Sequence, residues 1–150
     1  MNLKKKKLLL IGLVLVSATW AVSSIYGKSN NEHTESITFT AHTLAEAQKM
    51  ATAQNKLIFV DAFATWCGPC KRLAKNVFTD PSVAAYFNKN FINLKLDVDQ
   101  PDGKVFSSAR NVTALPTLLF ISAEGQEVKR TVGLVTPEQL LELAKSVENN

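Results

Sequence analysis

A short apolar run that leads directly into two closely spaced cysteines constrains the fold of this chain more than any other feature. The run covers residues 57–64 and is rich in Ile, Val and Phe. Its length and composition are typical of a buried central strand. The sequence Cys67-Gly68-Pro69-Cys70 follows, and Pro69 fits the first turn of a helix, where its missing N–H group costs little. We therefore predict a strand–turn–helix unit with Cys67 at the N-terminus of the helix.

The rest of the chain alternates predicted strands and helices. Besides the central strand, we expect strands at residues 37–40, 91–99, 117–122 and 127–133, with a hairpin turn at 123–126. We expect helices after Thr43, from the cysteine motif to about residue 78, at 82–88, at 103–110 and after Thr136. This β-α-β-α-β-α-β-β-α order predicts an α/β fold, in which helices flank a central sheet of mixed strand direction.

The first 27 residues have the pattern of an export signal. Four lysines, Lys4 to Lys7, precede an apolar run at residues 8–16, and no charged residue follows until Lys28. A cleaved signal peptide and an uncleaved membrane anchor both fit this pattern. Either one would carry the rest of the chain outside the cytoplasmic membrane. We therefore expect a signal peptide or anchor at 1–27, a polar linker at 28–36 and one folded domain at 37–150.

The basic character of the chain belongs to this N-terminal segment. Five of the 17 Lys and Arg residues lie within residues 1–28, where none of the 13 Asp and Glu residues falls. The remaining residues carry 12 basic against 13 acidic side chains. The predicted domain thus lacks the basic stripe of a nucleic-acid-binding protein. We expect membrane contact only through the N-terminal segment, if that segment is retained.

Three structural roles compete with redox chemistry for the two cysteines. A structural disulfide would stabilise the fold little, because the gain shrinks as the closed loop shortens. A zinc site needs about four ligands, and the only two histidines, His33 and His42, lie in or near the linker. Idle buried thiols are unusual in an oxidising compartment. We therefore favour a redox-active pair, with no metal and no cofactor.

The position of the cysteine pair suggests how it would react. Unpaired N–H groups and the helix dipole favour negative charge at a helix N-terminus, so Cys67 is the expected attacking thiolate. Cys70, one turn further on, would resolve the mixed disulfide through which exchange proceeds. Gly68 leaves room for the backbone of a partner.

Asp61 is a carboxylate inside the otherwise apolar run. Burial makes a carboxylate costly unless it is neutral or paired, so desolvation should raise its pKa. Such a group could accept the proton of Cys70 during resolution. The alternative is a structural Asp that bonds backbone groups. Lys95 is the best candidate partner, provided that its strand neighbours the strand of Asp61.

Four segments of the sequence, in this order along the chain, resemble the thioredoxin family. They are residues 60–71, residues 95–99, residues 115–118 and the pair Val132-Gly133, and the resemblance extends over roughly residues 37–148. It implies a thioredoxin fold with a cis Leu115–Pro116 bond beside the disulfide. It also implies Cys67 as nucleophile, Cys70 as resolving thiol and Asp61 as the buried acid of the family.

The resemblance implies roles for further residues. Lys95 resembles the family's lysine near the buried acid, and Trp66 resembles its aromatic residue beside the cysteines. The surface that receives an extended substrate strand would include Trp66, Gly68, Pro69, Leu115, Pro116 and Gly133. Residues 77–91 form a longer stretch than in small cytosolic thioredoxins. This stretch resembles the exported branch of the family, which includes the C-terminal domains of transmembrane reductant carriers.

The predicted function is thiol–disulfide exchange outside the cytoplasm, in the periplasm or at the outer face of the membrane. We favour a reductase that opens disulfides in exported proteins, because Cys-Gly-Pro-Cys in thioredoxins is poised to be reducing. An oxidase or isomerase in the same compartment is the first alternative. A non-catalytic binding module on the same scaffold is the second, because fold does not fix function. The electron donor would be a separate protein, such as a transmembrane reductant carrier.

Overall fold

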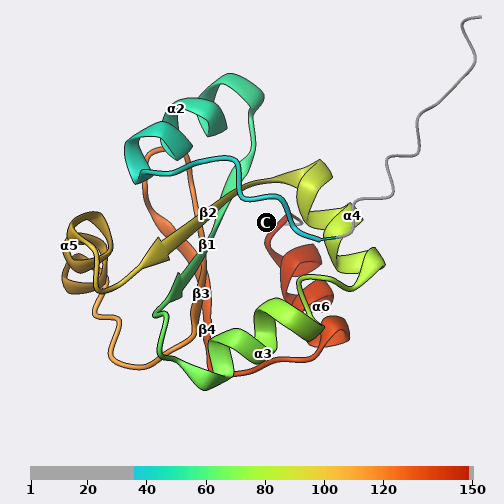
Figure 1. The fold of residues 1–150 in the computed structure, drawn as a ribbon. Helices are drawn as coiled ribbons and strands as arrows, with labels where there is room; N and C mark the ends of the chain where they lie inside the picture. Colours follow the sequence, from blue (N-terminus) through green and yellow to red (C-terminus); the bar gives the residue numbers. More distant parts are fainter. Residues whose placement is uncertain (1–35, 149–150) are drawn as a thin grey trace, which may run out of the picture. The chain divides into compact units, whose positions relative to one another are not determined.

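Four strands form one sheet in the spatial order β2-β1-β3-β4 (Figure 1). The computed structural model describes residues 36–148, and the strands are β1 (Leu57–Phe63), β2 (Phe91–Asp97), β3 (Thr117–Ile121) and β4 (Glu127–Val132). β1 pairs parallel with β2 and antiparallel with β3, and β3 pairs antiparallel with β4. The sheet is therefore mixed, and the predicted apolar run is one of its two central strands.

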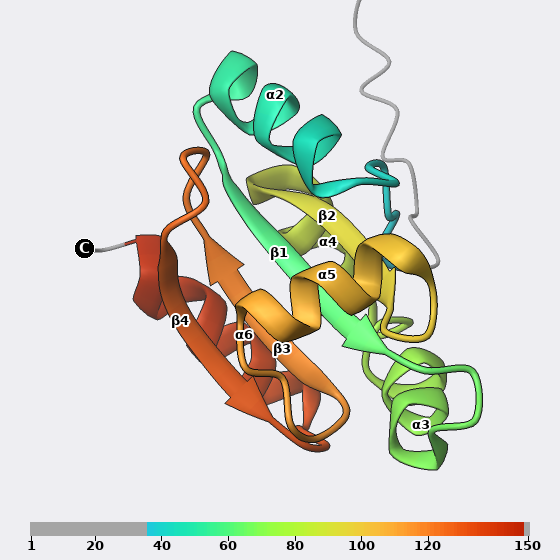
Figure 2. The same ribbon diagram turned by 90° about the vertical axis from the view of Figure 1, so that its left-hand side faces the viewer.

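Within residues 36–148, five helices cover the two faces of this sheet. They are α2 (Leu44–Gln54), α3 (Gly68–Asn76), α4 (Pro81–Asn90), α5 (Pro101–Ala109) and α6 (Pro137–Glu148). α2 and α5 pack on one face, whereas α3, α4 and α6 pack on the other (Figure 2). The predicted flanked mixed sheet is confirmed.

Alternate residues of β1 pack into two apolar cores, one on each face of the sheet. Ile58, Val60 and Ala62 face α2 and α5, whereas Phe59 packs among aromatic rings under α4 and α6. Because strand side chains alternate between faces, Asp61 lies on the same face as Phe59. The acid is thus placed on the side of the sheet where α3, the helix of the cysteines, also packs.

Helix starts agree with the local sequence signals. The Thr43 side chain accepts a hydrogen bond from the N–H group of Glu46 at 3.1 Å and begins α2. Asp80 begins α4 by accepting from the N–H groups of Ser82 at 2.9 Å and Val83 at 3.0 Å. These short polar side chains satisfy N–H groups that the helix itself leaves unpaired.

The predicted strand at residues 37–40 is wrong. The segment is irregular, and only the next residue, Ala41, forms an isolated bridge with Leu94 of β2. Its backbone N–H groups bond to unrelated partners: Ile37 donates to the Phe78 carbonyl, and Thr38 donates to the Asn88 side chain. Four alternating residues cannot distinguish a strand from an extended segment that is bonded in this way.

The expected signal or anchor at 1–27 lies outside the described residues, as does nearly all of the expected linker. Within residues 36–148, no helix combines the length and the apolar character needed to span a bilayer.

Candidate active site

Cys67 and Cys70 form a disulfide at the start of α3, with their Cα atoms 5.3 Å apart. Cys67 is the residue that caps α3, and its Sγ accepts a hydrogen bond from the Cys70 N–H group at 3.1 Å. Both side chains are almost fully buried, with 4% and 5% of their surface exposed. The first sulfur therefore takes the place that an oxygen takes in an ordinary helix cap.

This geometry favours Cys67 as the nucleophile once the pair is reduced. The N–H group that now bonds its sulfur would donate to a thiolate at the same position, and hydrogen bonds to charged acceptors are the stronger kind. The helix dipole acts in the same direction. Cys70 lies one turn inside the helix, within bonding distance of Cys67.

Asp61 and Lys95 occupy opposite positions on adjacent strands. They are register partners in the parallel pair β1–β2, and Lys95 Nζ lies 3.2 Å from Asp61 Oδ2. Asp61 is only 2% exposed, and its Oδ1 atom has no hydrogen-bond partner among the described residues. Burial raises the pKa of Asp61, and the charge of Lys95 offsets part of that rise. The structure thus provides a buried acid that holds its proton more tightly than an ordinary Asp.

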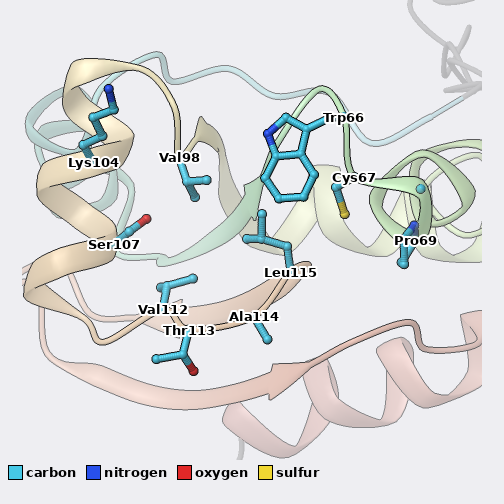
Figure 3. A pocket seen from close by; sticks show the side chains of 11 residues that line it. Trp66, Cys67, Pro69, Val98, Lys104, Ser107, Val112, Thr113, Ala114 and Leu115 are labelled. Atoms are coloured by element: carbon cyan, nitrogen blue, oxygen red, sulfur yellow. The ribbon is translucent and has the colours of Figure 1, made fainter.

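A groove of about 660 Å³ opens beside the disulfide (Figure 3). Trp66, Cys67, Gly68, Pro69 and Leu115 line it, so five of the predicted site residues meet there. In Figure 3 the α5 side chains lie on one side of the groove, and Trp66 and Cys67 lie on the other. Such a concave, largely apolar surface next to a reactive sulfur suits the approach of a polypeptide.

Trp66 and the loop before β3 form the rim of the site. Trp66 is 69% exposed, and its indole N–H group donates to Asp99 Oδ2 at 2.7 Å. The Leu115–Pro116 peptide bond is cis. The Pro116 carbonyl accepts a hydrogen bond from the Gly133 N–H group at 2.8 Å, and Gly133 has a positive φ of 91°. Pro116 and Gly133 are therefore joined to each other but do not line the groove.

The sequence did not reveal the opposite wall of the groove. Lys104 and Ser107 of α5, Val98, and residues 112–114 complete its lining. Helix α5 was predicted, but the direction in which its side chains point depends on how it docks against β2. In the described part of the chain, no group of His, Cys, Asp and Glu side chains is arranged to hold a metal ion.

A family model described as thioredoxin-like domain matches residues 44–148. The chain belongs to the thioredoxin-like domain family. This confirms the resemblance to the thioredoxin family that the segments around the cysteine motif indicated.

Named relatives agree with this membership. The solution structure of a proposed disulphide isomerase from Bacteroides thetaiotaomicron is similar to this chain, with 46% sequence identity and a TM-score of 0.68. The alignment covers 76% of this chain and 94% of the Bacteroides chain. The thiol:disulfide interchange protein DsbD of Tatumella citrea is 34% identical over 63% of this chain. Thioredoxin-2 of Pyricularia oryzae is 38% identical over 66% of this chain. The matches span only 17% of the DsbD protein and 55% of Thioredoxin-2.

Proposed function

We propose that this protein is a protein-disulfide reductase that opens disulfides in exported proteins. The observation that carries the proposal is the cap of α3, where Cys67 Sγ accepts a backbone N–H group and also lines an open groove. A substrate disulfide could reach this sulfur, and the surrounding N–H group would stabilise the thiolate that attacks it.

The reaction would take two exchange steps. First, the Cys67 thiolate attacks one sulfur of the substrate disulfide, which forms a mixed disulfide and releases the other substrate sulfur as a thiolate. Cys70 then loses its proton to Asp61 and attacks Cys67 Sγ. The intramolecular disulfide forms, the second substrate sulfur leaves, and two electrons have passed to the substrate. A dithiol donor would restore the reduced pair by the same steps in reverse.

Six residues would position the substrate beside the sulfur. Trp66 and Leu115 offer apolar contact in the groove, Gly68 and Pro69 leave the approach to Cys67 open, and Pro116 precedes β3 at the rim. Gly133 would leave room for the substrate backbone, because a Cβ atom there would meet nothing within 4 Å. An extended strand of the substrate fits this combination of open backbone and apolar wall.

The proposed compartment follows from the N-terminal sequence. The lysine cluster and apolar run of residues 1–27 would export the domain, which we place at 37–150 after a linker at 28–36. Its substrates would be disulfide-containing proteins on the outer side of the membrane. The relatives named thiol:disulfide interchange proteins favour an electron donor that is itself a dithiol protein, such as a transmembrane reductant carrier.

Replacing the resolving cysteine tests the mechanism. In Cys70→Ser, the second exchange step is blocked, so Cys67 should retain substrates as stable mixed disulfides that dithiothreitol releases. The matched variant Cys67→Ser should trap none. Failure of Cys70→Ser to trap any exported protein in intact cells would contradict the proposal.

A disulfide isomerase or oxidase is the second candidate, and the proposed role of the Bacteroides thetaiotaomicron relative favours it. The reduction potential separates the two directions. We expect a value near that of thioredoxin, about −270 mV, whereas protein disulfide isomerase lies near −180 mV. We also expect alkylation of acid-quenched cells to find the pair mainly reduced. A potential above about −180 mV, with an oxidised pair in cells, would support the alternative.

A further inference from the structure

The ammonium group of Lys95 lies among three aromatic rings as well as beside Asp61. Its Nζ atom is 4.5 Å from the ring centroid of Phe63, 5.2 Å from that of Phe39 and 5.6 Å from that of Phe78. All three distances are within the range of cation–π attraction. We call these three rings the lysine cage.

The cage is assembled from three separate parts of the chain. Phe63 ends β1, Phe78 follows α3, and Phe39 belongs to the segment before α2. Phe39 also contacts Phe78 edge to face, with their centroids 5.6 Å apart. The rings therefore support one another, and the Phe39 ring depends on how the segment at 36–41 is held.

Lys95 has an alternative to its place beside Asp61. Its side chain is 29% exposed, and it lines a cavity of about 430 Å³ together with His42, Asp97 and Asp102. A lysine side chain is long and flexible, and water or the nearby carboxylates can solvate its ammonium group. The Lys95 ammonium therefore stays beside Asp61 only if some contact disfavours the orientation in which it points out into that cavity.

We propose that the lysine cage positions the Lys95 ammonium against Asp61, and that Phe39 is a positioning residue for the proton step at the disulfide. The link to catalysis rests on the proposed function, in which Asp61 accepts the proton of Cys70. The positioning itself does not, because it concerns only the pairing of two charged groups.

Removing one ring should loosen the ammonium group by a measurable amount. The loss of one exposed cation–π contact corresponds to about a two- to fivefold change in the balance between paired and outward Lys95. When Lys95 turns outward, Asp61 loses the positive charge that favours its ionised form. The pKa of Asp61, which burial already raises, should then move further upward.

The test is an NMR titration of Asp61 in oxidised protein labelled with ¹³C-aspartate, where the disulfide keeps both cysteines from titrating. Phe39→Leu should shift the Asp61 titration upward, and Phe39→Tyr, which retains a ring, should leave it at the wild-type position. Phe91→Leu is the matched control, because Phe91 is a buried ring of the same core and is not among the described rings that make a cation–π contact with Lys95. Lys95→Met gives the limit for complete loss of the cation.

Two results would overturn the proposal. One is an unchanged Asp61 titration in Phe39→Leu and in Phe63→Leu, which probes a second wall should the first variant fold poorly. The other is an equal shift in Phe39→Tyr or Phe91→Leu. A failure of the proposed function would look different: Asp61→Asn would resolve mixed disulfides with the wild-type pH profile, while the cage variants still moved the Asp61 titration.

Discussion

At the scale of single residues, Asp61 combines two opposing influences. It is only 2% exposed, which favours its neutral form, and it pairs with Lys95, which favours its ionised form. Burial has the larger effect, so its pKa in the folded protein exceeds the ordinary value of 3.8. Between these two values the folded chain holds a proton at Asp61 that the unfolded chain has released.

This difference predicts how stability changes with pH. Because the folded state binds the additional proton, the free energy of unfolding should fall as pH rises from 3.8 through the raised folded-state pKa of Asp61. One pKa unit corresponds to about 1.4 kcal/mol. Asp61→Asn should remove this part of the decline. Urea unfolding of oxidised protein from pH 4 upward measures it.

The exposed, neutral residue Gln54 of α2 supplies the control. Gln54→Asn changes no titrating group and should keep the wild-type dependence of stability on pH. A decline of equal steepness in Asp61→Asn and in wild type would contradict the assignment of this proton to Asp61.

At the scale of elements, the docking of α5 against β2 depends on one glycine. A Cβ atom at Gly103 would lie 1.9 Å from the backbone carbonyl oxygen of Asp97, which ends β2. Only a residue without a side chain permits this approach. The same helix carries Lys104, the residue after Gly103, and Ser107, one turn further, which both line the groove.

Gly103→Ala should therefore displace α5. Such overpacking against backbone costs about 1–3 kcal/mol, and we expect a loss of that size in the free energy of unfolding. Gly68→Ala is the matched control for stability, because the nearest atom to its Cβ is Arg72 Nη1 at an ordinary 3.8 Å. Thermal and urea unfolding would measure the free energy of unfolding of both variants. Equal losses in Gly103→Ala and Gly68→Ala would contradict the role of Gly103 in docking α5.

At the scale of the whole molecule, buried Asn93 holds the segment at 36–41 against the sheet. Its side-chain amide donates to the Thr38 carbonyl at 3.2 Å, and its backbone carbonyl accepts from the Thr40 N–H group at 3.1 Å. Asn88 adds a bond from its amide to the Ser36 carbonyl at 3.1 Å. These contacts replace the ladder of the strand that was expected there.

Asn93→Leu should release the segment at 36–41 before the rest of the fold opens. The substitution leaves the Thr38 and Phe87 carbonyl groups without the Asn93 amide donor, which costs about 1–3 kcal/mol. The Thr38 and Thr40 amides should then exchange with solvent faster than those of β1. Hydrogen exchange monitored by NMR measures this order. Thr40→Ala changes an exposed side chain of the same segment and should leave the exchange of Thr38 unaltered; release in both variants would argue against Asn93 as the residue that holds the segment.

Much of the site follows from local sequence. The run before Trp66 is typical of a buried strand and Pro69 of the first turn of a helix, so the position of Cys67 was predictable. The pairing of Asp61 with Lys95 needed one fact that the sequence lacks, the adjacency of β1 and β2 in register. The residues and the family resemblance both predicted the pair, and the structure shows the contact.

Other features depend on contacts between distant segments. The lysine cage joins Phe39, Phe63 and Phe78 from three elements, and no spacing in the sequence relates them. The α5 wall of the groove depends on the close approach at Gly103. The segment at 37–40 alternates like a strand, but Thr38 bonds to the side chains of Asn88 and Asn93 rather than to a strand backbone, and only the next residue, Ala41, bridges to β2.

The central place of β1 has a consequence for the durability of the site. Hydrogen-bonded neighbours protect this strand along both sides, and local opening in proteins begins at exposed edges and ends of the chain. β4 or the segment before α2 can therefore detach briefly without moving the loop that leads into Cys67. Cys67 and Cys70 would therefore keep their relative positions while outer parts of the fold open locally.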